Sequence, residues 1–504
     1  MAKIAVTTDP DKFRHTLQGC PKLSDRSSPE AYIWNMSTPT DAYSAVVTTG
    51  IYCRPGCTAR PTAANVRRYW VAAAAEAAGF RACLRCRPYR RRQLVRWDGP
   101  ELICRAVQLI LEGALEGQTE DALASRLNMS ARNLRRLFNQ HVGVTPAQLA
   151  RSSRTHFARR LLDDTDLSVT DIAFAAGFGS TRQFNRAVRD IFRATPGELR
   201  ARRRKADRLV ADGGLLLRLP YDRPLDWPHT LAYLAARATP GVESVANGVY
   251  RRTVVIDGDP GVIELFEGDR ERGVAAGSHL LLRAHLPHWG GLIHFVERVR
   301  RIAALDFPIA EANAALSSDP LIGPIIVARP GVSQPGAWDP FEVGVRTILG
   351  QQASVASAST TSGRLVRALG IPVRGLTAFG LTHTFPTAET LAFADLSDLG
   401  LTRARAAAVQ SFASAVAEGR LPLDNSQPLD DFATAVMALP GLGPWTAHVL
   451  AFRLGERDAF PSSDLGLRRA YERLKSGPTP SLEERSEAWR PWRAHAAAHL
   501  WAAN

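Results

Sequence analysis

The sequence predicts a multidomain protein with four consecutive parts: a small α+β domain, an all-α domain, an α+β subdomain with an antiparallel sheet, and a second all-α domain. Three observations lead to this prediction. All six cysteines fall within the first 104 residues, a 50-residue repeat follows, and strand-like segments then give way to helical periodicity. The expected boundaries, 1–95, 96–212, 213–330 and 331–504, suit a chain of 504 residues.

The positive charge of the chain is concentrated in its first half. Residues 1–212 hold 35 of the 63 Lys and Arg residues and 20 of the 49 Asp and Glu residues, a net charge of +15, whereas the rest carries −1. This bias indicates a polyanionic partner such as nucleic acid, with a solubilising surface as the alternative. The N-terminus lacks the apolar segment of a secretory signal and no apolar run could cross a bilayer, so a cytoplasmic protein without a membrane partner is expected.

Four cysteines form two close pairs in the first predicted domain, Cys53 with Cys57 and Cys83 with Cys86. Twenty-five residues separate the pairs, and this spacing is typical of a tetrahedral zinc site built from two knuckles. Two disulfides or four buried thiols are the alternatives, but clustered cysteines in a cytoplasmic protein favour a metal. One zinc ion is therefore expected, and it would hold the cysteines as thiolates, the nucleophilic form of sulfur.

Arginines crowd these cysteines, which indicates that the zinc knuckles lie against phosphates. They are Arg54, Arg60, Arg67, Arg68, Arg81, Arg85, Arg87, Arg90, Arg91 and Arg92.

The strings TTGIYCRPGC at residues 48–57 and GFRACLRC at residues 79–86 resemble the N-terminal domain of the Ada adaptive-response regulators. In that family the first cysteine irreversibly accepts a methyl group from a methylphosphotriester in DNA, and by position this residue is Cys53. The resemblance implies a single-turnover methyltransferase whose methylation is the damage signal. Conversion of a thiolate to a thioether removes about one negative charge, so the affinity for DNA should rise.

A repeat with an offset of 50 residues between about 100 and 205 predicts two copies of a helix-turn-helix unit. Asp121, Ser130, Thr145 and Pro146 recur as Asp171, Ser180, Thr195 and Pro196. Ser130 and Ser180 are expected to cap the second helix of each unit, and Ser168 with Asp171 is a predicted capping box.

Polar side chains on the second helix of each unit suit contacts in the DNA major groove, with an ordinary helical bundle as the alternative. The candidates are Arg132, Arg135 and Arg136 in the first unit and Arg182, Gln183 and Arg186 in the second.

The strings GVTP at residues 143–146 and ATP at residues 194–196 add to a resemblance to the AraC-type DNA-binding domain. In Ada regulators such a domain follows the zinc domain, as it does here, so the resemblance implies transcriptional activation and contact with RNA polymerase. Ada proteins often end with a second methyltransferase domain built around a Pro-Cys-His-Arg site. No cysteine follows Cys104, so that second activity is not expected.

Strand-like segments at 215–219, 249–256, 262–266 and 279–286 predict an antiparallel sheet, with a turn at 257–261. From about residue 338 onward the pattern is almost entirely helical.

The string LPGLGPWTA at residues 439–447 is typical of a helix-hairpin-helix. Gly441 and Gly443 would let backbone N–H groups approach a DNA phosphate, with the start of the next helix around Thr446 assisting. An ordinary connection between helices is the alternative. Asp464 follows Trp445 by 19 residues.

The hairpin and this aspartate together resemble the helix-hairpin-helix DNA glycosylase superfamily, in which an aspartate at the place of Asp464 is catalytic. Its carboxylate can stabilise the positive charge that develops on the sugar, although Asp464 taken alone could be a helix cap. Bifunctional members carry a lysine where this chain has Trp445, so the resemblance implies a monofunctional enzyme that hydrolyses the glycosidic bond without lyase chemistry.

ILGQQASV at residues 348–355 and WRPWR at residues 489–493 resemble DNA-3-methyladenine glycosylase II in particular. That family implies that Trp445 and Trp501 line a pocket for a flipped, cationic purine, with core packing as the alternative for Trp501. The chain departs from the family at Gln352, where the duplex wedge is a leucine, and at Val449, where a tyrosine is expected.

The sequence therefore predicts an Ada-type regulator fused to a glycosylase for alkylated purines of the 3-methyladenine and 7-methylguanine class. Its partner would be double-stranded DNA, both damaged and promoter DNA, on the bacterial nucleoid, and its cofactor one zinc ion with no nucleotide cofactor. Three alternatives are a transcriptional regulator with a catalytically silent glycosylase half, a repair enzyme that its front half merely tethers to DNA, and a purely structural DNA-binding protein.

Overall fold

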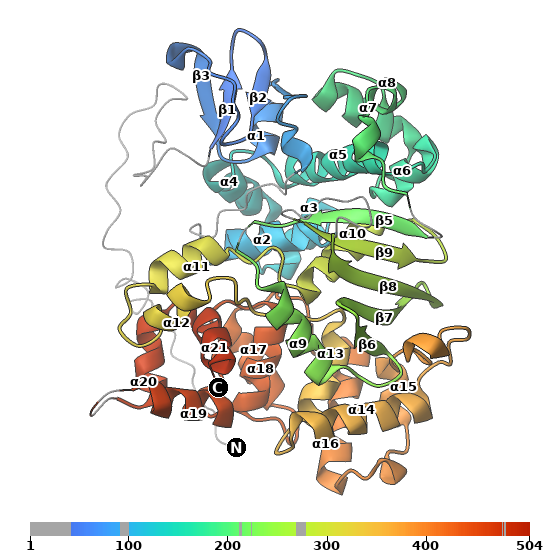
Figure 1. The fold of residues 1–504 in the computed structure, drawn as a ribbon, viewed down its shortest axis with the longest axis vertical. Coiled ribbons are helices and arrows are strands. Elements are labelled where there is room, and N and C mark those ends of the chain that lie inside the picture. The colour runs from blue at the N-terminus through green and yellow to red at the C-terminus, as the bar shows by residue number, and fades with distance from the viewer. Residues whose placement is uncertain are drawn as a thin grey trace, which may run out of the picture. The chain divides into compact units, whose positions relative to one another are not determined.

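The computed structural model describes residues 42–90, 100–210, 214–222, 224–268, 279–475, 477 and 480–503. The described residues belong to one compact unit, and Figure 1 shows their helices and strands. The predicted boundaries at 95/96 and 212/213, together with Arg91 and Arg92, lie outside the described residues. No helix in the described part of the chain is long and apolar enough to span a bilayer.

The predicted first domain is a small α+β fold, as expected. Its sheet has the order β3-β1-β2-β4, in which β2 and β4 are parallel and the other pairs antiparallel. The strands are β1 (Tyr43–Val46), β2 (Ile51–Cys53), β3 (Val66–Tyr69) and β4 (Arg81–Ala82), with helix α1 (Ala72–Ala77) and the 3-10 turns η3 (Ala63–Asn65) and η4 (Pro88–Arg90). Because Tyr52 pairs with Ala82, Cys53 and Cys83 leave the sheet at the same end of adjacent strands.

The next part is all helical, and the repeat gives two helix-turn-helix units, as predicted. The helices are α2 (Glu101–Leu111), α3 (Glu120–Arg126), α4 (Ala131–His141), α5 (Pro146–Asp164), α6 (Val169–Ala175), α7 (Thr181–Phe192) and α8 (Pro196–Ala201). Ser130 caps α4 and Ser180 caps α7, as expected. The second helix of each unit, its recognition helix, therefore begins at the predicted residue.

The capping box predicted at Ser168 is only half formed. Ser168 accepts a hydrogen bond from the backbone N–H of Asp171, but the Asp171 carboxylate accepts from the Ser168 hydroxyl instead of its N–H. Aspartate is one methylene shorter than the glutamate that closes such a box. Complete boxes do start α5 and α8, at Thr145 and Thr195, where the residue three positions on is a glutamine or a glutamate.

A five-stranded antiparallel sheet with the order β5-β9-β8-β7-β6 follows. Its strands are β5 (Leu215–Pro220), β6 (Glu243–Ala246), β7 (Val249–Ile256), β8 (Asp259–Glu267) and β9 (His279–His285). All four predicted strands are present, and the short edge strand β6 was missed. The β7–β8 turn is shorter than predicted: Asp257 and Gly258, with φ of +49° and +92°, form a two-residue connection, so β8 starts at Asp259.

The remainder is helical, as expected after residue 338. The helices are α9 (Trp227–Arg237), α10 (Leu292–Ile302), α11 (Ile309–Leu316), α12 (Gly323–Ala328), α13 (Pro340–Leu349), α14 (Val355–Leu369), α15 (Ala388–Phe393), α16 (Arg403–Ala417), α17 (Leu429–Met437), α18 (Pro444–Leu454), α19 (Leu465–Leu474), α20 (Leu482–Ser486) and α21 (Arg493–Ala502). One large apolar core unites α13 to α21. A second core contains residues from the first domain, the second helix-turn-helix unit and the five-stranded sheet.

Close packing of α13 on α16 fixes the turn that follows α13. A Cβ added at Gly344 of α13 would overlap the ring of Phe412 in α16. We therefore expect Gly344→Ala to lower the free energy of unfolding by about 1–3 kcal/mol, measured as a lower midpoint of thermal unfolding. Gly197→Ala in α8 is the control, because nothing lies within 4 Å of its Cβ position. Equal midpoints for the two variants would contradict this packing.

Candidate functional site

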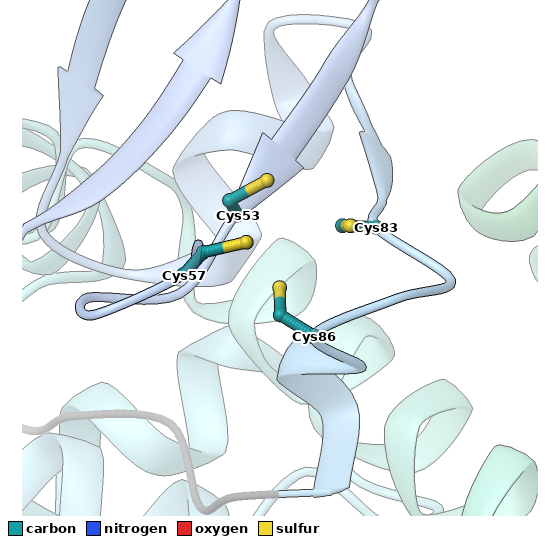
Figure 2. Close-up of side chains that lie close together, drawn as sticks. All are labelled: Cys53, Cys57, Cys83 and Cys86. Atoms are coloured by element: carbon teal, nitrogen blue, oxygen red, sulfur yellow. The ribbon is translucent and has the colours of Figure 1, made fainter. Parts of the chain in front are cut away.

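The four predicted metal ligands converge on one point. Their Sγ atoms all lie within 4.8 Å of one another, and Figure 2 shows the four side chains pointing toward a common centre. A tetrahedral zinc ion with bonds of about 2.3 Å would place its sulfurs about 3.8 Å apart. The cluster of Cys53, Cys57, Cys83 and Cys86 therefore fits a single zinc ion, and in the described ranges no second group of three or more such ligands occurs.

The thiols of this cluster interact strongly with one another. The hydrogen bond with Cys53 lowers the pKa of Cys86 to about 5. The same hydrogen bond, with burial, raises the pKa of Cys53. The sulfurs are thus close enough that negative charge on one disfavours it on its neighbour, and a bound cation would remove this conflict.

Exposure differs among these cysteines and among their arginines. Cys53 is only 7% exposed, whereas the other three cysteines are half-buried.

Four of the predicted phosphate-facing arginines are exposed: Arg60, Arg67, Arg68 and Arg85. Arg87 and Arg90 instead turn inward and form ion pairs with Asp163. The expectation that all of these arginines face phosphates was therefore wrong for these two, because buried carboxylates of the helical domain bind them.

Asp464 lies where three helices of the C-terminal domain meet. It is the N-cap of α19, and its side chain accepts a hydrogen bond from the backbone N–H of Leu467. The indole Nε1 of Trp445 donates to Asp464 Oδ2 and that of Trp501 donates to Oδ1, both at 2.9 Å. The structure thus brings together the three residues predicted for catalysis and for the base pocket. Asp464 is a helix cap and, at the same time, part of this cluster.

The geometry of this cluster suits a fixed negative charge beside aromatic surfaces. Three donors and the N-terminus of α19 hold the carboxylate in one orientation. All three side chains are half-buried, so they border solvent. Trp501 also makes an edge-on contact with Phe452, with ring centroids 5.0 Å apart. A carboxylate between aromatic side chains of this kind attracts a flat cation.

The predicted hairpin connects α17 to α18. Gly441 has a φ of +79°, and a Cβ added at Gly443 would meet nothing within 4 Å, so the loop is open on that side. Thr446, by contrast, is 3% exposed and its hydroxyl accepts a hydrogen bond from Gln351 Nε2. Its side chain therefore faces a neighbouring turn of the protein.

That neighbouring turn carries Gln352, the residue at the wedge position. Gln352 is exposed and has a φ of +51°, a left-handed conformation that is uncommon for a residue other than glycine. Gln351 donates both to Thr446 and to the carbonyl oxygen of Gly441, and Arg405 donates to the Gln351 carbonyl. The hairpin and the exposed turn are thus fastened together.

Sequence patterns did not identify Gln351 and Arg405 as site residues. The only available signal was the first glutamine of the string ILGQQASV, because partners 54 to 95 residues away leave no local pattern.

The predicted DNA-reading side chains lie apart from both clusters, on α4 and α7. Arg132, Arg135, Arg136, Arg182, Gln183 and Arg186 are all exposed. Arg135 forms an ion pair with Glu120, and Arg136 donates to the side chain of Asn133. The side chain of Arg186 is 85% exposed, and its Nε lies 4.0 Å from Asp190 Oδ2.

Four family models match consecutive parts of the chain. They are the metal binding domain of Ada (residues 35–89), a helix-turn-helix domain (123–202), the AlkA N-terminal domain (216–339) and the HhH-GPD superfamily base excision DNA repair protein (345–494). These matches agree with the predicted regulator, glycosylase and metal-binding features, and with DNA as the partner.

Some related proteins align with one part of this chain, and others with most of it. The DNA-3-methyladenine glycosylase 2 of Escherichia coli is 33% identical over 56% of this chain and 95% of its own length. The bifunctional transcriptional activator/DNA repair enzyme Ada of E. coli is 36% identical over 31% of this chain and 43% of its own length. The Probable bifunctional transcriptional activator/DNA repair enzyme AlkA of Mycobacterium tuberculosis is 40% identical over 463 residues, 91% of this chain and 92% of its own length. This chain therefore belongs to the family of bifunctional transcriptional activator/DNA repair enzymes AlkA.

Proposed function

We propose that this protein records DNA methylation damage on Cys53 and hydrolyses the glycosidic bond of alkylated purines with Asp464. The observation that carries the proposal is the Asp464 carboxylate, held between the indoles of Trp445 and Trp501 beside a helix-hairpin-helix. We infer domains at residues 1–95, 96–212, 213–330 and 331–504, with the first two regulatory and the last two forming the glycosylase.

In the glycosylase reaction the damaged nucleotide leaves the duplex and its base binds beside Asp464. Gly441 and Gly443 bind the backbone through N–H groups, while Gln352 fills the space that the base has left. A cationic purine of the 3-methyladenine or 7-methylguanine class is attracted to the faces of Trp445 and Trp501.

Bond cleavage needs little more than electrostatic stabilisation, because the alkylated purine is already a good leaving group. The glycosidic electron pair leaves with the base, which becomes neutral, and the Asp464 carboxylate stabilises the positive charge on the sugar. A water molecule then adds to the sugar and loses a proton. Trp445 offers no amine for a Schiff base, so the enzyme is monofunctional and leaves an abasic site.

In the sensing reaction the Cys53 thiolate attacks the methyl carbon of a methylphosphotriester. The carbon–oxygen bond breaks and an ordinary phosphodiester anion leaves, while the sulfur becomes an uncharged thioether. Zinc, when bound, keeps the cysteines as thiolates. The loss of one negative charge favours DNA binding by the exposed arginines.

The arginines of α4 and α7, with Gln183, then contact promoter DNA in successive major grooves. Activation implies contact with RNA polymerase and a protein that works on the nucleoid.

Asp464→Asn tests the glycosylase assignment. Asparagine is a good N-cap and keeps an oxygen for one indole, so the fold should persist, whereas the loss of charge should slow base release about 10²- to 10³-fold. The measurement is the rate of free purine release from methylated double-stranded DNA. Asp395→Asn is the control, since Asp395 also accepts a backbone hydrogen bond, from Ser397, in an exposed turn. Unchanged release by the Asp464 variant would contradict the assignment; absence of any release from the unaltered protein would leave the silent-glycosylase alternative standing.

Cys53→Ala tests the methyl acceptor. The zinc-loaded, unaltered protein incubated with DNA that carries labelled methylphosphotriesters should take up about one methyl group per chain, as a single thiolate acceptor requires. The Cys53→Ala variant should take up none. Peptide mass mapping should find the label on Cys53. Cys104→Ala should behave like the unaltered protein, because Cys104 is buried outside the cluster. Label on Cys57, Cys83 or Cys86, which are more exposed, would show that another sulfur is the acceptor.

A further inference from the structure

Helix α5 is the linker between the two helix-turn-helix units, and it is buried for most of its circumference. From Thr155 to Asp164 every residue except Arg160 is buried. A connecting helix between two DNA-reading units would ordinarily keep a solvated face. The burial of α5 shows that something other than these units covers it.

One side of α5 is bound to the domain that carries the cysteines. The Tyr52 hydroxyl donates to Glu76 Oε1 at 2.6 Å, and His156 Nε2 lies 2.6 Å from the same oxygen. Tyr52 directly precedes Cys53, and Glu76 is on α1. This buried group thus joins the strand of the first zinc ligand to the middle of α5.

A second group of contacts joins the other cysteine pair to the C-terminal end of α5. Arg87, which directly follows Cys86, donates to Asp163 at 2.9 Å and also binds Asp207. Arg90 binds Asp164 at 2.9 Å, and the Tyr89 hydroxyl donates to Asp163. Asp163 is wholly buried and pairs in addition with Arg159 of its own helix. The second zinc knuckle is therefore held by the carboxylates of α5.

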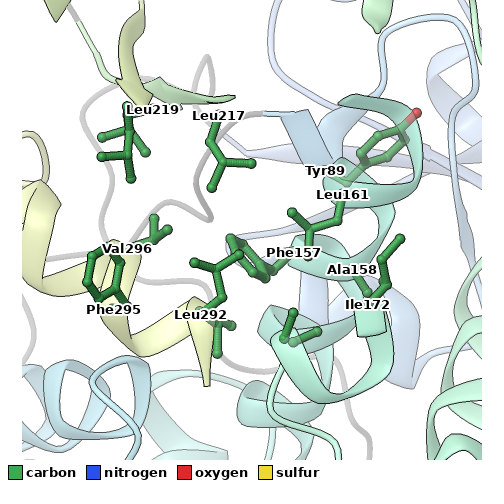
Figure 3. Close-up of a cluster of buried hydrophobic side chains, with 14 of the residues drawn as sticks. Tyr89, Phe157, Ala158, Leu161, Ile172, Leu217, Leu219, Leu292, Phe295 and Val296 are labelled. Atoms are coloured by element: carbon green, nitrogen blue, oxygen red, sulfur yellow. The ribbon is translucent and has the colours of Figure 1, made fainter. Parts of the chain in front are cut away.

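Another side of α5 packs on the glycosylase half. Figure 3 shows the buried side chains involved: Phe157 and Leu161 from α5, Leu217 and Leu219 from β5, and Leu292, Phe295 and Val296 from α10. The ion cluster reaches the same sheet, since Arg218 of β5 lies 3.2 Å from Asp164. Arg218 also donates to the backbone oxygen of Asp207.

The charged groups at the end of α5 therefore come from three segments: α5 itself, the second zinc knuckle and β5. Burial raises the pKa of Asp164 despite the attraction of Arg90 and Arg218, which shows how unfavourable the charged form becomes without its partners. If the second knuckle loses its order, Asp163 and Asp164 lose Arg87 and Arg90 and are left with Arg159 and Arg218 as partners, which weakens the fit of the end of α5 against β5.

We propose that α5 couples the cysteine cluster to the glycosylase half, so that metal binding by the cysteines orders β5 and α10. The coupling is reciprocal: whatever stabilises β5 also raises the affinity of the cysteines for the metal. The proposal goes beyond the proposed function and depends on zinc binding alone, not on methyl transfer or base release.

Hydrogen–deuterium exchange of the full chain tests this coupling, with and without removal of zinc by a chelator under reducing conditions. Removal should speed exchange in residues 155–164, 215–220 and 292–302 by about tenfold, since coupled sites typically shift an equilibrium by about 5- to 150-fold. Helix α18 should not respond, because it belongs to the other core. Faster exchange in residues 81–90 shows that the metal has left.

The Asp163→Asn variant distinguishes coupling through α5 from a general loss of stability. This variant should exchange quickly at 215–220 with zinc bound and lose its response to the chelator. Asp166→Asn is the matched control, because Asp166 lies just beyond the same helix and binds Arg203 and Arg208 at the surface. It should keep the full response.

Three results would overturn the proposal. They are an unchanged rate at 215–220 when residues 81–90 respond to the chelator, a uniform acceleration that includes α18, and an Asp163→Asn variant that responds as Asp166→Asn does. None of these outcomes depends on whether the protein accepts methyl groups or releases bases, so failure here leaves the proposed function untouched.

Discussion

A buried carboxylate must find positive partners, and two adjacent carboxylates at the end of α5 impose this constraint on much of the chain. The two carboxylates have their full set of cationic partners only when the second zinc knuckle reaches both of them and β5 reaches Asp164. An unpaired charge in this place would cost several kcal/mol, which is a large part of the stability of an ordinary domain. The zinc domain, the second helix-turn-helix unit and the five-stranded sheet consequently share one apolar core.

Helix termini place most of the groups to which we assign functions. Asp464 caps α19, Gly443 precedes α18, and Ser130 and Ser180 start the recognition helices. A residue at the start of a helix has a fixed backbone direction and faces the positive end of the helix dipole. For Asp464 the hydrogen bond that starts the helix also helps to orient the carboxylate, so structural and chemical roles coincide in one side chain.

The positive charge of the first half has two uses. Part of it lies on exposed faces, as in Arg67 and Arg85 beside the cysteines and Arg186 on α7. Another part is internal, since Arg87 and Arg159 neutralise buried aspartates. Net charge therefore indicates the class of partner, but it overstates the number of arginines available to meet that partner.

The sequence alone determined the local features of this protein: the two cysteine pairs, the helix caps at Ser130 and Ser180, the four long strands and the glycine hairpin. Each depends on residues within a few positions of one another, so spacing and residue type suffice to predict it. Only the tertiary structure decided that Trp501 meets Asp464 across 37 residues, that Gln351 binds Gly441 across 90, and that α5 is enclosed on two sides. Such contacts arise when elements distant in the chain pack together, and the side chains that form them follow no period that a sequence displays.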